Sequence, residues 1–105
     1  MQTSPHAAVS TGDLTTSLND ELSRVDAHVD GTLVGFSAYE VCSDGTWSFH
    51  HTETFEEYSG KGYGKQLAAG VMDVVREQGV KIAPTCPFLR KYMEQHPETE
   101  ELRAD

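Results

Sequence analysis

The alternation of apolar and polar residues changes character once along the chain, near residue 60. Residues 22–29 alternate with a period of two, which predicts a half-buried strand. A tight-turn dipeptide follows at residues 30–31, and a second strand is expected over 33–41. Turn residues at 43–45 precede a third predicted strand at 47–54. The first half is therefore predicted to be an antiparallel meander.

The second half carries helical periodicity instead. Beyond a glycine-rich stretch, apolar residues recur at helical spacing, at Leu67, Ala68, Val71, Met72, Val74 and Val75. Gly79 is a typical helix stop, and residues 80–83 predict a short buried strand that Pro84 ends. Pro87 suits the start of a second helix, which is expected to run to about Gln95.

Strand, turn, helix and strand form one βαβ unit, so the strands around residues 50 and 82 are expected to be parallel. The predicted fold class is α/β with a mixed (α+β) sheet: an antiparallel meander, then a parallel βαβ unit and a C-terminal helix. Residues 1–20 are rich in Ser and Thr and lack periodicity, which predicts a disordered tail before one domain at 21–105.

The chain is acidic overall, but its basic residues gather late. The formal net charge is -9, which argues against binding to nucleic acid or anionic membranes. Seven of the eight basic residues follow residue 60: Lys61, Lys65, Arg76, Lys81, Arg90, Lys91 and Arg103. The second half therefore offers an anionic ligand its best field.

Cysteine spacing and hydropathy add further expectations. Cys42 and Cys86 form no close-spaced pair, and His50 and His51 should point to opposite faces of a strand, so no metal site is expected. Residues 1–10 do not resemble a signal peptide, and no stretch reaches the length of a membrane span. We expect a cytoplasmic monomer or weak homodimer.

The stretch Ser59-Gly60-Lys61-Gly62-Tyr63-Gly64 is the best candidate ligand site. Glycines at a helix start allow a ligand to reach the backbone, and the first N–H groups of the helix attract an anion. Lys61 and Lys65 add positive charge, so a pyrophosphate would fit. The pattern lacks the ending of a P-loop and the third glycine of a dinucleotide-binding turn. A flexible turn without a ligand is the alternative.

This turn resembles that of the GNAT superfamily of N-acetyltransferases, which carries R/Q-x-x-G-x-G/A. Ser59 stands where the family has Arg or Gln. A branch of short, stand-alone GNAT-like proteins is more similar still, over about residues 22–102. The shared motifs are His51-Thr52-Glu53, Gly60-Lys61-Gly62-Tyr63-Gly64, Lys81-Ile82-Ala83-Pro84-Thr85-Cys86-Pro87-Phe88 and His96-Pro97-Glu98.

The resemblance implies that acetyl-coenzyme A (acetyl-CoA) or coenzyme A (CoA) binds where the two parallel strands splay apart. Pantetheine would lie along the strand before the turn, and the diphosphate would lie on the turn. Full-length members have two helices between the first two strands that help form the acceptor site; here only residues 30–31 separate the first two predicted strands. The implied coenzyme contacts are Thr52, Thr54, Phe55, Ser59, Gly60, Lys61, Gly62, Tyr63, Gly64, Lys65, Cys86, Pro87, Arg90 and Lys91.

Four residues are candidates for catalysis. Cys86 precedes a predicted helix start, which favours the thiolate, and Arg90 and Lys91 would add to this; the alternative is a buried thiol acting as a small apolar group. His51 and Glu53 share a strand face, and either is a candidate general base or an ordinary exposed residue. The resemblance implies that Tyr92 protonates the leaving thiolate, although packing is an equal explanation. We interpret Phe49 and Phe88, with Trp47 and Phe55, as core residues.

Three functions fit the sequence. The first is acetyl-CoA-dependent N-acetylation of an amine, on a small molecule or a peptide lysine. The second is a non-catalytic module that binds CoA or acyl-CoA. The third is a small interaction domain whose glycines only shape a turn.

Overall fold

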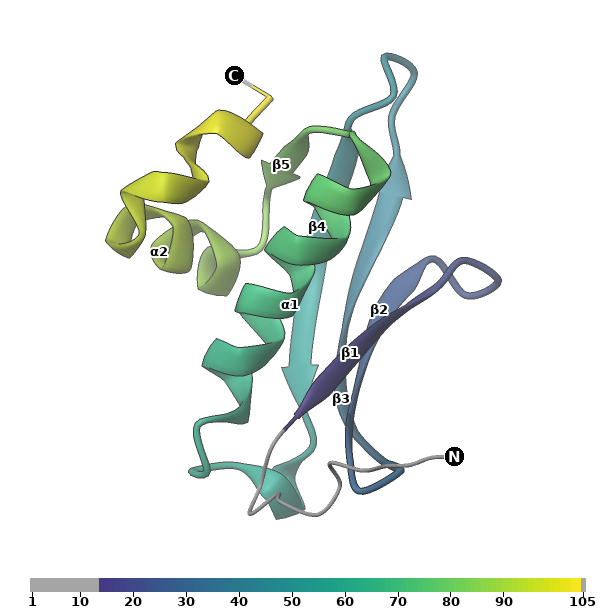
Figure 1. Cartoon of the computed structure of the whole chain (residues 1–105), viewed down its shortest axis with the longest axis vertical. Coiled ribbons are helices and arrows are strands. Elements are labelled where there is room, and N and C mark those ends of the chain that lie inside the picture. The colour runs from purple at the N-terminus through teal and green to yellow at the C-terminus, as the bar shows by residue number, and fades with distance from the viewer. Residues whose placement is uncertain (1–13, 105) are drawn as a thin grey trace.

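The computed structural model describes residues 14–104 of the 105-residue chain. Five strands form one sheet in the order β1-β2-β3-β4-β5, and α1 lies across one of its faces with α2 beside it (Figure 1). The strands are β1 (Thr15–Asn19), β2 (Arg24–Val29), β3 (Thr32–Val41), β4 (Trp47–Thr54) and β5 (Ile82–Pro84). The helices are α1 (Tyr63–Gln78) and α2 (Pro87–Gln95), with 3-10 turns η2 (Glu56–Tyr58) and η3 (Pro97–Leu102).

The antiparallel meander predicted from the alternation is confirmed. β2 pairs with β3, and β3 pairs with β4, both antiparallel. The first of these hairpins turns at Asp30 and Gly31, which both have positive φ, as a two-residue turn of this kind requires. Val25 and Ala27 are fully buried, so the apolar half of the predicted alternation faces the core.

The prediction that residues 1–20 form a disordered tail is wrong for its last part. Thr15–Asn19 is strand β1, which pairs antiparallel with β2 from Thr15↔His28 to Asn19↔Arg24. Its polar composition hides it, because an edge strand needs only a few inward-facing contacts. Thr16 packs against Gly70 of α1, where a Cβ would overlap the threonine side chain. The rest of the predicted tail, residues 1–13, lies outside the described residues.

β1 also moves the connection between the first two strands. The sequence placed this connection at residues 30–31, but the first two strands are β1 and β2, and residues 20–23 join them. This turn is tight: Leu22 N–H donates to the Asn19 side chain at 3.2 Å, and Ser23 has a φ of 54°. Four residues leave no room for two helices.

The predicted βαβ unit is confirmed. β4 and β5 are parallel, with Trp47 opposite Ile82 and Phe49 opposite Pro84. α1 connects them and buries one apolar stripe, while its C-cap Gly79 has the left-handed φ of 69°. The pattern therefore predicted both the helix and its stop residue, because only one face of α1 meets the sheet.

One hydrophobic core joins the sheet to both α-helices. Phe49 of β4, Leu67 and Val71 of α1, and Leu89 and Met93 of α2 are all at most 1% exposed and belong to the same cluster. Because α1 and α2 share this cluster, they cover the same face of the sheet. The other face carries Arg24, Phe36, His51 and Glu53; we call it the open face, since no described helix covers it.

Candidate functional site

β4 and β5 separate after a short pairing. Their ladder ends at Phe49 and Pro84, and the Phe49 carbonyl then accepts the Cys86 N–H at 2.9 Å and the Thr85 hydroxyl at 3.0 Å. Beyond this point the chain after β5 turns into α2, while β4 continues to Thr54. Residues 50–54 of β4 therefore have no partner among the described strands on this side, and we call the space beside them the gap.

A β-bulge determines which main-chain groups face this gap. Tyr39 pairs with Phe49 but Ala38 pairs with His51, so His50 is an extra residue in β4. Further along, the Phe55 N–H donates to the Val34 carbonyl, on the β3 side, at 2.9 Å. Main-chain groups alternate in direction along a strand, so those of Thr54 and Thr52 point to the opposite side, into the gap.

Cys86 lies at the inner end of the gap, as the N-cap residue of α2. It is 6% exposed, and its Sγ lies 3.5 Å from Oγ1 of Thr52. Burial is the largest influence on the pKa of the thiol and raises it. The Thr52 hydroxyl and the N–H groups of Leu89, Phe88 and Thr52 together outweigh burial, so the pKa lies below its usual value.

We expected Arg90 and Lys91 to favour the Cys86 thiolate, but neither is among these influences on its pKa, and none of the influences is a charged side chain. Both residues are exposed. Lys91 faces the α1 side of α2, whereas Arg90 lines a different hollow together with Arg103. Hydroxyl and amide dipoles, not cations, therefore account for the lowered pKa.

His51 and Glu53 form a pair on the open face. His51 Nε2 lies 3.2 Å from Glu53 Oε1, and their side chains are 55% and 46% exposed. Phe36 lies beneath them, with its ring centroid 5.9 Å from that of His51. Because side chains alternate along a strand, Thr52 projects the other way, towards Cys86. The candidate base and the candidate thiol therefore flank the gap from opposite faces of the sheet.

The glycine turn presents its backbone to solvent. Gly60 and Gly62 have φ values of 81° and 80°, and a Cβ at either position would meet nothing within 4 Å. Gly62 caps α1 without a side-chain hydrogen bond, and the first turn of the helix holds no acidic residue. Exposed Lys61 and Lys65 flank it. Within residues 14–104, no side chain caps this helix start, so its N–H groups are available to an anion such as a diphosphate.

Ser59 is an exception within the turn. Its N–H and its hydroxyl both donate to the Glu56 carbonyl, at 3.1 and 2.9 Å. Both donors of this residue are used inside the 3-10 turn η2. The available donors of the turn therefore begin at Gly60.

A cavity of about 340 Å³ lies between the start of α1 and the length of α2, and it is lined by Lys65, Phe88, Lys91, Tyr92 and Gln95. The interpretation of Phe88 as a core residue is wrong, because it is 41% exposed. Tyr92 stacks on His96, with ring centroids 3.9 Å apart. Burial, then the carboxylates of Glu98 and Asp73, raise the pKa of Tyr92.

Sequence reasoning missed Ser37 and Phe36. Ser37 is 0% exposed, and its hydroxyl lies 2.9 Å from that of Thr52. Phe36 contacts Phe55 and His51, and the Arg24 guanidinium lies 4.7 Å from its centroid. The available signal was strand alternation, which places Ser37 on the inward face with Gly35 and Tyr39. Nothing in the sequence indicated its partner.

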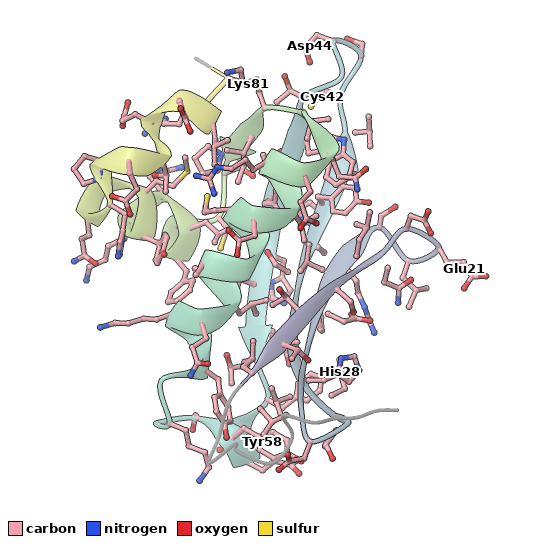
Figure 2. The ribbon with its side chains drawn as sticks, viewed as in Figure 1. Glu21, His28, Cys42, Asp44, Tyr58 and Lys81 are labelled. Atoms are coloured by element: carbon pink, nitrogen blue, oxygen red, sulfur yellow. The ribbon has the colours of Figure 1, made fainter. Side chains whose placement is uncertain are left out.

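The described residues contain neither a metal cluster nor a membrane helix. No three His, Cys, Asp or Glu side chains among residues 14–104 are grouped to hold a metal ion. Within the same residues, no helix is both long and apolar enough to cross a bilayer. Both cysteines are free; Cys42 is exposed and lies near Asp44 at the β3–β4 turn, at the far end of the molecule from Tyr58 (Figure 2).

Comparison with known proteins gives consistent matches. Residues 24–102 match the family model described as GCN5-related N-acetyl-transferase. Protein NATD1 of Xenopus tropicalis is 36% identical over 59 residues, which cover 56% of this chain and 54% of that protein. Human Protein NATD1 is 34% identical over 59 residues, covering 56% of this chain and 52% of that protein. The match thus spans little more than half the length of these curated relatives.

A solved structure has the same fold. Ribosomal-protein-alanine N-acetyltransferase from Brucella melitensis biovar Abortus 2308 superposes with a TM-score of 0.51 and 29% identity. The match covers 70% of this chain and 59% of that one. The mixed sheet with its helices is therefore shared with a solved N-acetyltransferase structure.

Proposed function

Because the chain belongs to the GCN5-related N-acetyltransferase (GNAT) family, we propose that it transfers an acetyl group from acetyl-CoA to an amine. The observation that carries this proposal is the uncapped start of α1 at the glycine turn, next to the gap between β4 and β5. Amides at the turn suit a diphosphate, and the second half of β4, which has no described strand partner on the gap side, suits the peptide-like pantetheine arm.

The residues of the chain divide this work among them. The N–H groups from Gly60 to Lys65 would hold the diphosphate, with Lys61 and Lys65 adding charge. Thr52 and Thr54 would bind pantetheine through their main-chain groups. Lys91 lines the same cavity as Lys65, where it could contact coenzyme groups near the diphosphate. Acetyl-CoA supplies an acetyl thioester; its acetyl group passes to the acceptor nitrogen, which loses a proton, and CoA leaves as the thiol.

Proton transfer would fall to the residues that flank the gap. The exposed Glu53, paired with His51, can accept the proton of an ammonium group that approaches from the open face. Tyr92 keeps its proton at neutral pH, as a donor to the departing thiolate must. Cys86 would lie beside the thioester at the inner end of the gap and is the candidate for a transient acetyl group.

Thiol release from acetyl-CoA, measured with a panel of polyamines and lysine peptides, tests this function. We expect amine-dependent release that falls at least tenfold in Glu53→Gln, because general-base catalysis supplies about 10²–10⁴-fold. Glu77→Gln, on the exposed side of α1, is the matched control and should leave the rate unchanged. Release that no amine stimulates would reject the transferase.

Intact mass after incubation with acetyl-CoA tests the role of Cys86. An acetyl adduct that disappears in Cys86→Ala would establish a covalent route. An unmodified protein that still turns over would establish direct attack by the amine, with Glu53 or His51 as the base.

The alternative function is a non-catalytic module that binds CoA or acyl-CoA. The four-residue connection between β1 and β2 favours it, because no described helix completes an acceptor pocket on the open face. A thermal-shift series with acetyl-CoA, CoA, ATP and NAD separates the possibilities. Stabilisation by the first two without amine-dependent release would support the module, and no response to any of them would support a plain interaction domain.

A further inference from the structure

Three side chains, from β3, β4 and the start of α2, form a continuous polar chain at the edge of the core. Ser37 Oγ of β3 lies 2.9 Å from Thr52 Oγ1 of β4, and Thr52 Oγ1 lies 3.5 Å from Cys86 Sγ at the start of α2. The first member of the chain is 0% exposed and the last is 6% exposed. We propose that Ser37 is a positioning residue: it orients the Thr52 hydroxyl, and the Thr52 hydroxyl in turn orients the sulfur of Cys86 and donates a hydrogen bond to its thiolate.

The hydrogen-bonding capacity of the hydroxyls supports this assignment. A hydroxyl has one hydrogen to donate and two lone pairs that accept. With Cys86 as a thiol, its S–H donates to Thr52. With Cys86 as a thiolate, that hydrogen is gone, so the Thr52 O–H turns to donate to sulfur. Thr52 then needs a donor of its own, and the buried O–H of Ser37 provides it.

The position of Ser37 would otherwise be costly. A hydroxyl buried without a partner destabilises a fold, and an apolar residue would fill an inward-facing strand position more simply. Ser37 is held between Gly35 and Tyr39 on the core face of β3, where Thr52 is its hydrogen-bond partner. Packing alone does not account for a buried serine that is hydrogen-bonded to a threonine, which in turn contacts a thiol.

Charged groups do not provide an alternative explanation. The titratable side chains that are exposed on the elements around Cys86 are His50, His51 and Glu53 of β4, Glu40 of β3, Arg90, Lys91 and Glu94 of α2, and Lys65, Asp73, Arg76 and Glu77 of α1. Tyr39, Tyr63 and Tyr92 are less exposed, but none of them is among the influences on the thiol. The influences on the thiol are burial, the Thr52 hydroxyl, and N–H groups of Thr52 and of the first turn of α2. The hydroxyl chain is the part of this set that a side-chain substitution can remove.

The inference rests on the proposed function only for its catalytic consequence, so its test measures the thiol directly. In a Cys42→Ser background, thiolate absorbance near 240 nm is followed with pH, and the matching Cys86→Ala protein is subtracted. We expect Thr52→Val to lower the thiolate fraction near neutral pH about threefold to tenfold, the value of one hydrogen bond. Ser37→Ala should lower it about twofold to threefold.

Two further variants separate positioning from packing. Thr52→Ser keeps the hydroxyl and should restore the thiolate fraction of the parent, although it removes a methyl group. Ser48→Ala removes a hydroxyl from the same strand that bonds Thr85 rather than Thr52, and should leave the titration unchanged. Melting temperatures show whether each variant is folded at the pH of the measurement.

The outcomes for this proposal and for the proposed function are independent. If the Cys86 thiol titrates alike in Ser37→Ala and Ser48→Ala while both proteins remain folded, Ser37 does not act through Thr52, whatever the acetyltransfer assays show. If the loss of thiolate fraction is largest in Thr52→Val, smaller in Ser37→Ala and absent in Ser48→Ala, the proposal holds even when no amine is acetylated. Should Ser37→Ala prove unfolded, Thr52→Val against Thr52→Ser decides: equal thiolate fractions would overturn the proposal.

Discussion

Gly64 and Phe88 touch where the starts of α1 and α2 approach each other. A Cβ on Gly64 would lie 3.0 Å from Cζ of the Phe88 ring. The absence of a side chain at Gly64 therefore lets the ring cover the first turn of α1. The partly exposed ring of Phe88 forms one wall of the cavity that Lys65 and Lys91 also line.

The Gly64–Phe88 contact predicts how substitutions at Gly64 behave. Gly64→Ala should leave stability nearly unchanged, because the ring tip can shift and alanine gains about 1 kcal/mol of helix propensity. Gly64→Leu should push the ring and α2 away, costing about 1 kcal/mol or more and weakening CoA binding. Ala69→Leu, exposed on the same helix, is the control. Urea unfolding and calorimetric titration with CoA measure both effects; unchanged binding in folded Gly64→Leu would contradict the role of this contact.

The left-handed conformation of Gly62 predicts a loss of both stability and binding. Gly62→Ala forces an L-residue to a φ near 80°, which costs about 1 kcal/mol, and it places a methyl group where a diphosphate would approach. Gly45→Ala is matched, with a φ of 88° and open space, but lies in the β3–β4 turn. We expect equal decreases in melting temperature and a loss of CoA affinity in Gly62→Ala alone. Equal CoA affinities would show that the turn is only structural.

The lowered pKa of Cys86 predicts a pH dependence of stability. An unfolded thiol titrates near 8.5, and the folded thiol titrates below that value, so the unfolded state binds more protons between the two. The free energy of unfolding of the parent should therefore rise with pH through this window, relative to Cys86→Ser, and the difference between the two proteins should become independent of pH below the folded pKa. Urea titrations under reducing conditions at pH 6 and pH 9 measure it. A difference that shrinks with rising pH would mean that burial prevails.

The packing of Thr16 on Gly70 predicts that Gly70→Ala changes stability in the direction opposite to that expected from helix propensity. Gly70→Ala would normally stabilise a helix by about 1 kcal/mol, but here the added methyl overlaps the Thr16 side chain. We expect Gly70→Ala to destabilise the protein by about 1–3 kcal/mol, as overpacking does, and Thr16→Gly to recover part of the loss. Denaturant unfolding of the single and double variants gives the coupling. A more stable Gly70→Ala would place β1 away from α1.

Most of the fold could be predicted from the periodicity of apolar residues, because burial of one face of a helix or strand leaves a regular spacing in the sequence. The apolar stripe of α1, the stop at Gly79 and the strand at Trp47–Thr54 followed from it. β1 did not, because Thr15–Asn19 is a polar edge strand stabilised by pairing with β2 and by close contact with Gly70. Those are tertiary causes that a local pattern does not contain.

The candidate site was predictable only in part. Glycines before a helix indicated the turn, and a cysteine before a proline indicated the start of α2. The bulge at His50, which directs the amides of Thr52 and Thr54 into the gap, depends on the pairing register with β3. Ser37 was out of reach for the same reason, because its partners Thr52 and Cys86 are brought to it by the sheet and by α2.

The availability of the amides between Gly60 and Lys65 is what coenzyme binding depends on most. An NMR titration of the ¹⁵N-labelled chain with CoA observes each of these N–H groups separately. We predict that the resonances of Gly60, Gly62, Gly64 and Lys65 shift together and saturate, while that of Gly45 stays in place. If the amides of the turn do not move at CoA concentrations that shift other residues, or if nothing moves in the folded protein, the glycine turn is not a coenzyme site.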